Sequence, residues 1–224
     1  MRPFSVKKRS VNSSEVSRIR FSHWAASSAK LPSSGARALT SLASALRKAL
    51  GAKLLYIVAE TPESSGREYG YDYAALSALA DRLILRTGRY ETETGGFPTM
   101  PQEPLEEVYY AQASLSTPAD LSKSRLWLTT AGLGREGNRG GISYYPADRL
   151  AELLADTLTE RYYSARYADA YLHRTEGEIR TVVWYHDSRA AEARACLGAF
   201  FGVESVCLSA VEDASEELLK GLAG

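Results

Sequence analysis

The sequence predicts an α/β fold in which parallel strands alternate with helices. Short apolar runs rich in Val, Ile, Leu and aromatic residues recur along the chain, as in strands buried on both faces of a parallel sheet. Segments with apolar residues at helical spacing lie between them, and Gly- or Pro-rich connections separate the units. This alternation is typical of βα units.

The number of units limits the architecture. Four or five βα units are visible in 224 residues, whereas a closed eight-stranded barrel takes about 250 residues. A partial barrel, a barrel completed by another chain or segment, and an open doubly wound sheet all fit this pattern.

The N-terminal region is predicted to begin with an arm. Residues 1–18 are basic and Ser-rich without periodicity, which indicates a flexible arm, and residues 19–26 (IRFSHWAA) predict a short strand. Residues 27–35 form a predicted loop rich in Ser, Pro and Gly. A helix follows, because leucines recur at helical spacing and Gly51 supplies a stop: Leu39, Leu42, Leu46 and Leu50.

The remaining elements follow the same alternation, broken by a small antiparallel insert. In the first half of this region we expect strands at 53–59, 82–87 and 125–131 and helices at 73–80 and 105–115. A Gly/Pro loop is expected at 95–104 and a flexible Gly-rich loop at 132–141. The second half predicts helix 147–160, insert strands 162–172 and 179–185, helix 189–201, strand 205–208 and helix 212–222.

Composition excludes some classes of protein. Hydrophobic residues make up 45% and charged residues 24%, so the chain as a whole is not expected to be disordered. No apolar run reaches the roughly 18 residues that span a bilayer, and the basic start lacks the apolar core of an export signal. Cys196 and Cys207 do not make a disulfide framework, and we expect two buried, reduced thiols.

The charge is unevenly distributed although its formal sum is zero. Residues 1–50 contain ten Lys or Arg residues and the single acid Glu15, so the remainder is acidic. A basic arm can hold an anionic partner, but a solvated arm is the simpler interpretation, and we expect neither nucleic acid nor membrane as a partner.

Three stretches, in this order, resemble the glycoside hydrolases of family 18, especially the spore-cortex and cell-wall type. They are YDYAALSALADRLIL (71–85), PLEEVYYAQASLSTPADLSKSRLWLTTAGLGRE (104–136) and EIRTVVWYHDSRAAEARACLGAFFGVESVCL (178–208). The resemblance implies a partial (β/α)8 TIM-type barrel over residues 19–224, with a small α+β insertion at about 142–185. Residues 54–59 would be its fifth strand, and strands one to three would be missing.

The same resemblance implies that the hydrolytic site has been lost. Family members cleave β-1,4-linked N-acetylglucosamine polymers with the Glu of a DxxDxDxE motif at the fourth strand, which protonates the leaving oxygen. No such motif occurs in this chain, and residues 16–59 contain no acid at all. Fitting residues 19–26 to that strand puts Ser22 and Trp24 in place of the Asp and Glu.

Two further positions depart from the family pattern. Arg86, Thr87, Gly88 and Arg89 stand where the sixth strand usually ends in a Met-Thr-Tyr-Asp type sequence, so its substrate-contacting Tyr and Asp are lost. Ser209 stands where the eighth strand usually carries the Trp under the sugar. The expected function is therefore a catalytically degenerate domain, a pseudoenzyme that binds N-acetylglucosamine-containing glycans of chitin or peptidoglycan without cleaving them.

The candidate site residues follow from strand ends and exposed aromatic residues. Glu60 and Glu91, which follow the fifth and sixth strands, are the catalytic candidates, and the ordinary alternative is solvated or Arg-paired carboxylates. Four residues are candidates for sugar binding: Trp24, Arg89, Tyr144 and Tyr145. Trp127, within a strand, is expected in the core.

Neither a metal nor a cofactor is expected. The three histidines are scattered, and no His/Cys cluster has zinc spacing. His186 and Asp187 are expected at a surface turn, where Asp187 caps the following helix.

Two other functions stay open. One is an active glycosidase that uses Glu60 or an acid from a missing N-terminal half. The other is an interaction module that uses the basic arm. An incomplete barrel also leaves sheet edges for a second copy, or for a missing N-terminal segment, to cover. The resemblance suggests a cell-wall, spore or extracellular location, which this chain itself does not establish.

Overall fold

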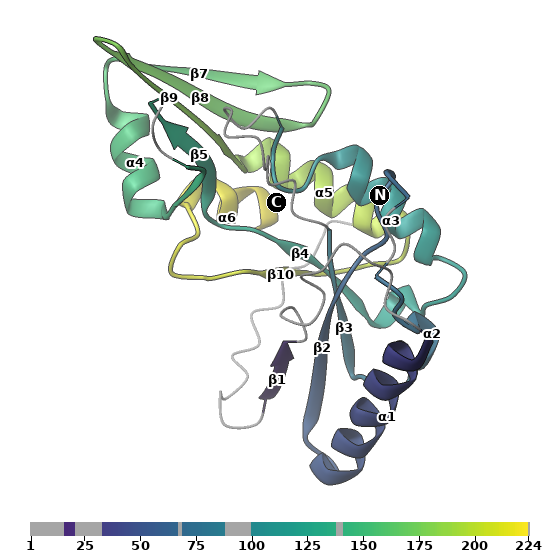
Figure 1. The fold of residues 1–224 in the computed structure, drawn as a ribbon. Helices are drawn as coiled ribbons and strands as arrows, with labels where there is room; N and C mark the ends of the chain where they lie inside the picture. Colours follow the sequence, from purple (N-terminus) through teal and green to yellow (C-terminus); the bar gives the residue numbers. More distant parts are fainter. Residues whose placement is uncertain (1–15, 21–32, 67–68, 88–99, 138–140, 224) are drawn as a thin grey trace.

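The computed structural model describes residues 16–20, 33–66, 69–87, 100–137 and 141–223. A parallel sheet of order β1-β2-β3-β4-β10 and an antiparallel sheet of order β6-β5-β9-β8-β7 make up the fold (Figure 1). The parallel strands are β1 (Val16–Arg20), β2 (Leu54–Glu60), β3 (Arg82–Arg86), β4 (Ser124–Leu128) and β10 (Val206–Leu208).

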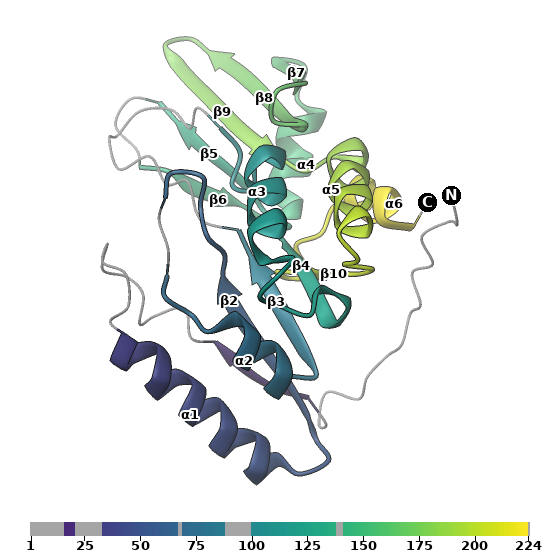
Figure 2. The same cartoon turned by 90° about the vertical axis from the view of Figure 1, so that its right-hand side faces the viewer.

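Helices cover one face of the parallel sheet. Figures 1 and 2 show α1, α2, α3 and α5 on the same side of it, in the manner of the outer ring of a (β/α) barrel. The helices are α1 (Ser33–Leu50), α2 (Tyr73–Leu79), α3 (Leu105–Leu115), α4 (Ala147–Ala155), α5 (Ser188–Phe200) and α6 (Glu216–Ala223), with a 3-10 turn at Leu121–Lys123. Across the described part of the chain, each helix is too short or too polar to cross a membrane.

The main core lies between the parallel sheet and these helices. In β2 the burial alternates, because Leu55, Ile57 and Ala59 face the helices and are at most 1% exposed. The intervening side chains are only half-buried. The expectation that this strand is buried on both faces is therefore wrong, and the sheet curves around a side that the described residues cover only in part.

The first strand begins earlier than the sequence predicts. β1 occupies Val16–Arg20 and pairs in parallel with β2, with Val16 opposite Leu54. Residues 16–18 thus belong to a strand and not to the arm, while residues 21–26 of the predicted strand lie outside the described residues. α1 also begins at Ser33, inside the predicted loop, and the rest of the arm is outside the described ranges.

The antiparallel insert begins at Gly132, where a flexible loop was predicted. β5 (Gly132–Glu136) pairs with β9 (Ile179–Tyr185) and with β6 (Ser143–Tyr145). A Cβ on Gly134 would lie 2.5 Å from Val183 Cγ2 and 2.6 Å from the Val182 carbonyl oxygen. The glycines therefore let strands pack closely, and the loop prediction is wrong.

A hairpin occupies the region in which a single strand was predicted over 162–172. It consists of β7 (Thr159–Ser164) and β8 (Asp169–Glu176), and its turn contains Ala168 at φ 50°. Ala168 is the one non-glycine residue with positive φ among the described residues, so the usual turn signal of Gly or Asn is absent there. α4 ends at Ala155 and not at residue 160, because β7 starts at Thr159.

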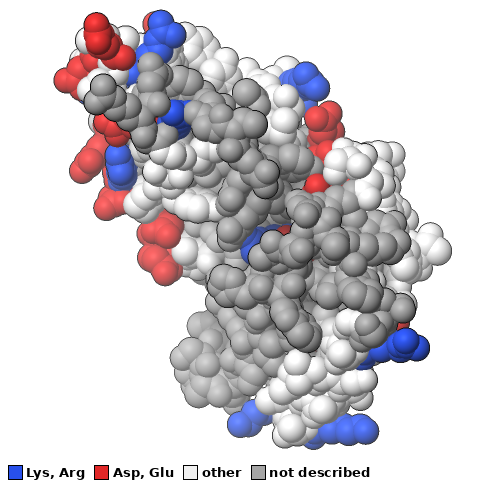
Figure 3. Space-filling model, viewed as in Figure 1, with Lys and Arg blue, Asp and Glu red and all other residues white. Residues whose placement is uncertain are grey.

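Charged side chains are unevenly distributed over the surface. On the face seen in Figure 3, acidic side chains gather over the insert, while mainly basic ones show at the end formed by α1. α1 has no acid in its first turn and carries Arg47 and Lys48 in its last. The thiol prediction is wrong on burial, because Cys196 is exposed and Cys207 is partly exposed, and the two are not joined by a disulfide.

Candidate functional site

The carboxyl ends of the parallel strands meet at one edge of the sheet, where barrels of this kind place functional residues. Glu60 ends β2 and Arg86 ends β3, and their Oε1 and Nη1 atoms lie 3.1 Å apart. Both side chains are 12% exposed. The Arg86 guanidinium also lies 5.6 Å from the centre of the Trp127 ring on β4. Glu60 is thus paired with Arg86 at the carboxyl ends of β2 and β3.

Aromatic side chains from the connection between β2 and α2, and from the first residue of α2, lie beside this ion pair. The rings of Tyr69 and Tyr71 stack with centres 6.3 Å apart, and Tyr73 meets Tyr71 edge-on at 5.7 Å. Tyr73 donates a hydrogen bond of 2.7 Å to the Glu60 carbonyl, which fixes the cluster to the end of β2. Burial raises the pKa of Tyr71 to about 12, and the charge of Glu60 adds to this. Its hydroxyl therefore remains a proton donor at neutral pH.

Hydroxyl groups line the ends of β4 and β10. Ser209 Oγ accepts a hydrogen bond of 3.0 Å from the Thr130 amide and lies 2.8 Å from the Thr130 hydroxyl. Ser209 occupies the position for which the resemblance implies a tryptophan. Its short side chain ties two strand ends together and offers no ring surface to a sugar.

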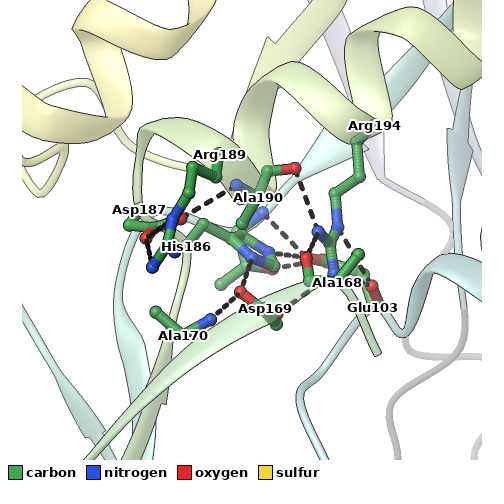
Figure 4. A network of polar contacts seen from close by, with 10 residues as sticks. Glu103, Ala168, Asp169, Ala170, His186, Asp187, Arg189, Ala190 and Arg194 are labelled. Carbon is green, nitrogen blue, oxygen red and sulfur yellow. Dashed lines mark hydrogen bonds and ion pairs between the residues drawn. The ribbon is translucent and has the colours of Figure 1, made fainter. Parts of the chain in front are cut away.

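A buried ionic network adjoins this edge (Figure 4). His186, directly after β9, has its Nε2 2.8 Å from Glu103 Oε2 and its Nδ1 2.9 Å from Asp169 Oδ1. Arg194 of α5 donates to the other oxygen of Asp169 at 3.1 Å. Glu103 also accepts hydrogen bonds from the amide and hydroxyl of Thr129, at the end of β4. We call Glu103, Asp169, His186 and Arg194 the ionic cluster.

Each carboxylate of the cluster lies against a cationic or titratable partner. Burial disfavours ionised Glu103, but the hydrogen bond and charge of His186 outweigh burial and lower the pKa of Glu103. Burial likewise opposes a charged His186, but the charge of Asp169 overrides it and raises the pKa of His186. Both shifts favour the charged forms of Glu103 and His186. When His186 is charged, its imidazolium donates from both nitrogens and has no lone pair to act as a base, and an ionised Glu103 has no proton to give.

The structure places some of the predicted site residues and leaves others outside its described ranges. Glu60 lies at the expected strand end, but Trp24, Arg89 and Glu91 fall outside the described residues. Tyr144 is 46% exposed on β6, away from the parallel sheet. Tyr145, predicted as a surface contact, is 1% exposed in the core of the insert beneath Arg149, so this prediction is wrong.

Two predictions made from local sequence patterns, for Asp187 and Trp127, agree with the structure. Asp187 caps α5, since its Oδ1 accepts from the Ala190 amide at 2.9 Å, as predicted. Trp127 is in the core as expected, at 8% exposure. The surface turn predicted for His186 is wrong, because Glu103 and Asp169 enclose its ring and leave the residue 8% exposed.

Sequence reasoning missed most of the polar residues near this edge. Glu103 and Tyr69 lie in connections with little periodicity, and Asp169 and Arg194 lie in a strand and a helix whose patterns give no functional signal. Their partners are far away in sequence: His186 is 83 positions from Glu103. Within the ranges that the structure describes, no three His, Cys, Asp or Glu side chains are arranged to hold a metal ion.

Comparison with known proteins identifies the architecture. No family model matches the chain, and no curated protein matches it in sequence. Solved structures do match. The chitinase from Chromobacterium violaceum ATCC 12472 superimposes with a TM-score of 0.69 at 18% identity, over 86% of this chain and 63% of that one.

Two further structures share this likeness. The spore cortex-lytic enzyme SleL of Bacillus megaterium QM B1551 has a TM-score of 0.70 at 17% identity, over 84% of this chain and 45% of its own. A family 18 N-acetylglucosaminidase from Paenibacillus barengoltzii has a TM-score of 0.66 at 16% identity, over 86% and 64%. The chain therefore spans less than two thirds of the length of these structures, and its fold is a partial (β/α)8 barrel.

Proposed function

We propose that this chain, whose fold is that of part of a glycoside hydrolase family 18 barrel, binds glycans that contain N-acetylglucosamine and does not cleave them. The neighbours in structure are named as a chitinase, a spore cortex-lytic enzyme and an N-acetylglucosaminidase, which supports this class of ligand. The missing acid motif and the chemistry of the sheet edge support the loss of cleavage.

The observation that carries the proposal is the Glu60–Arg86 ion pair. A general acid must keep a proton near neutral pH, which requires an apolar site or a neighbouring carboxylate. Glu60 instead faces a guanidinium at 3.1 Å, and an adjacent positive charge favours the ionised carboxylate. Another acid near this edge, Glu103, is held ionised by the cluster. Neither Glu60 nor Glu103 is therefore set up to protonate a leaving oxygen.

The surface offered to a sugar is the pair Tyr69 and Tyr71. Both residues are half-buried, and stacked aromatic rings suit the apolar face of a pyranose. The Tyr71 hydroxyl and the Arg86 guanidinium supply donors for an acetamide or hydroxyl oxygen. We place the glycan across these two tyrosines.

Binding is tested by titrating N-acetylglucosamine tetramer into isotope-labelled protein and following amide shifts. We expect shifts around residues 60–73, and we expect Tyr71→Ala to weaken binding up to about tenfold, since a stacked ring contributes about 0.5–1.5 kcal/mol. Tyr109→Ala is the matched control, because Tyr109 is 54% exposed on α3, on the helical side of the sheet. The absence of shifts at millimolar tetramer would refute the proposal.

Cleavage is tested separately with a chromogenic N-acetylglucosaminide. We expect no turnover above that of buffer. Turnover that disappears in Glu60→Gln would replace the proposal with the alternative of an active glycosidase that has recruited Glu60. Circular dichroism of Glu60→Gln controls for its fold, because the substitution removes a half-buried ion pair.

A further inference from the structure

Exposed aromatic rings gather on the helical layer, away from the sheet edge and the ionic cluster. Figure 2 shows α3 and α5 side by side. The Phe201 ring, directly after α5, meets Tyr109 of α3 edge-on at 5.6 Å and Phe200 at 5.0 Å between ring centres. Phe200 is 78% exposed and Tyr109 is 54% exposed. We call Tyr109, Phe200 and Phe201 the aromatic patch.

The aromatic patch differs from ordinary surface apolar residues. Single exposed apolar side chains are common on protein surfaces, but rings in mutual contact form a continuous apolar surface. Such a surface marks a place where another segment or molecule docks, because removal of the rings from water is favourable. The exposure of Phe200 shows that none of the described elements covers it.

The charges around the patch restrict what can cover it. Three exposed acids accompany the rings, on α3, on α5 and directly after it: Glu106, Glu192 and Glu204. Glu106 is three residues before Tyr109 and therefore shares its side of α3. Within the described residues, none of the three acids has an ion-pair partner. A segment that joins apolar side chains with positive charge would therefore fit this surface.

The N-terminal arm of this chain has that composition. Residues 1–15 lie outside the described ranges and lead directly into β1. The arm has two apolar residues followed at once by three consecutive cations: Phe4 and Val6, then Lys7, Lys8 and Arg9. Its single acid, Glu15, is at the far end from Phe4.

The length of the arm is sufficient for it to reach the patch. The chain enters β1 at Val16, the amino end of that strand. Phe200 is six residues before β10 begins at Val206, so the patch also lies toward the amino ends of the parallel strands. Four strand spacings separate β1 from β10, about 20 Å across the sheet. Fifteen extended residues span about 50 Å.

From these observations we propose that residues 1–15 dock on the aromatic patch of their own chain. Phe4 packs against Phe200, and the three consecutive cations of the arm face the three acids. The docked arm ties β1, an edge strand of five residues, to α5 on the helical layer. The inference involves none of the groups proposed to hold a glycan, so either proposal can fail without the other.

Limited digestion of the full chain with trypsin, followed by mass spectrometry, measures how often the arm leaves the patch. Trypsin cuts after the three consecutive cations only when that segment is free. We expect Phe4→Ser and Phe200→Ser each to speed this cleavage about tenfold, because each removes a buried ring. Tyr144→Ser is the matched control, since it removes an exposed ring on β6 and should leave the rate unchanged.

The role of charge is tested in the same assay. We expect the double variant Glu192→Gln with Glu204→Gln to speed cleavage, and added salt to do the same in the parent chain. Glu152→Gln, which removes an exposed acid on α4, should cleave like the parent chain. Rates are taken relative to a free peptide of residues 1–15, which corrects for the effect of salt on trypsin.

A spin label shows whether the arm docks on its own chain. Cys196 is exposed and lies four residues before Phe200 on α5, so a nitroxide attached to it in a Cys207→Ser chain reports on the patch. We expect broadening of the amide resonances of residues 4–9 at every protein concentration. Isotope-labelled chains without the nitroxide, mixed with nitroxide-bearing chains without the isotope, should show no broadening.

Three results would overturn the inference. Cleavage of the parent chain as fast as that of the free peptide would show that the arm is not docked. A rate unchanged by Phe200→Ser or by the double Gln variant would show that the patch or its acids do not hold the arm. Broadening confined to the mixed sample would assign the patch to the arm of a second copy. Circular dichroism of Phe200→Ser controls for its fold.

Discussion

His186 lies between two carboxylates that come from different parts of the chain, Glu103 before α3 and Asp169 at the start of β8. Arg194 of α5 donates a hydrogen bond to Asp169, and its Nε donates another, of 3.1 Å, to the Glu103 carbonyl. Each member of the cluster neutralises another, so the loss of one leaves a buried charge without its partner. The cost of such a loss exceeds the net contribution of the intact group.

Replacement of Arg194 is therefore expected to be costly. Arg194 is fully buried, and Arg194→Leu leaves Asp169 with one cation fewer and the Glu103 carbonyl with fewer donors. We expect the free energy of unfolding to fall by about 3–5 kcal/mol, measured by urea denaturation. Lys123→Leu, which breaks an exposed pair with Asp120, should unfold like the parent chain. Similar losses in the two variants would contradict the assigned role of the cluster.

The cluster also predicts how stability depends on pH. The pKa of Glu103 is lowered from 4.5, so its contribution is complete above 4.5 and is lost as the pH falls through the folded-state value. The pKa of His186 is raised from 6.5, so its contribution is complete below 6.5 and is lost as the pH rises through the folded-state value. Both are complete between pH 4.5 and 6.5.

We therefore expect the free energy of unfolding to decline on the alkaline side of pH 6.5, measured by urea denaturation from pH 5 to 9. His186→Gln keeps a side-chain donor but cannot titrate, so its profile should be flatter on that side. His173→Gln removes a partly exposed histidine and should keep the slope of the parent chain. An unchanged slope in His186→Gln would show that other groups set this dependence.

Single residues could be predicted from the sequence when their function is local. The cap at Asp187 needs only a partner three positions away, and its pattern is visible in the sequence. The burial of His186 depends on Glu103 and Asp169, 83 and 17 positions away, and a scattered histidine carries no sign of such partners. Glu60 was placed at the correct strand end, but its arginine partner is 26 positions away.

At the scale of elements, β5 shows how glycine can specify a strand. Gly134 lies where a Cβ would overlap Val183 and the backbone of Val182, so β5 and β9 can pair in this packing only without a side chain there. The sequence GLGREGNRGG looks like a loop because its glycines are counted as flexible. Their role in β5 is close packing, which composition alone does not reveal.

Gly134→Ala is expected to destabilise the insert. The added methyl must displace Val183 or the strand backbone, and overpacking of this kind costs about 1–3 kcal/mol. Gly141→Ala is the matched control, because nothing lies within 4 Å of its Cβ position. Thermal melts followed by near-ultraviolet circular dichroism should show a lower Tm for Gly134→Ala alone. Equal melts would mean that β5 is not held closely against β9.

Elements of the parallel sheet were easier to predict than those of the insert. The helix at 105–115 matches α3 residue for residue, and the strand predicted at 82–87 differs from β3 by one residue, because their apolar patterns are strong. The hairpin of β7 and β8 was missed, since Ala168 makes its turn without Gly or Asn. Polar and aromatic residues alternate across both strands, so the pattern appeared continuous.

At the scale of the whole molecule, the parallel sheet has two open edges. β1 and β10 are its outer strands, and within the described residues neither has a strand partner on its outer side. In a closed barrel these edges would be joined through further strands. An open edge offers unpaired amide and carbonyl groups to another chain. The sequence indicated the shortage of strands but not what covers the edges.

We therefore expect the 224-residue chain to self-associate. Light scattering after size-exclusion chromatography should give a mass above that of one chain, rising with protein concentration. Addition of a polypeptide that supplies further βα units of a (β/α)8 barrel should compete with this self-association. A mass of one chain at every concentration would contradict the expectation that the edges remain available.

The join between the two sheets has a consequence for how the molecule opens. Only residues 129–131 separate β4 from β5, and Glu103 links Thr129 at that join to His186 at the end of β9. The insert is thus fastened to the barrel through both of its ends, so it cannot swing away as a lid. Backbone amides of β4, β5 and β9 should exchange with deuterium through one shared cooperative opening.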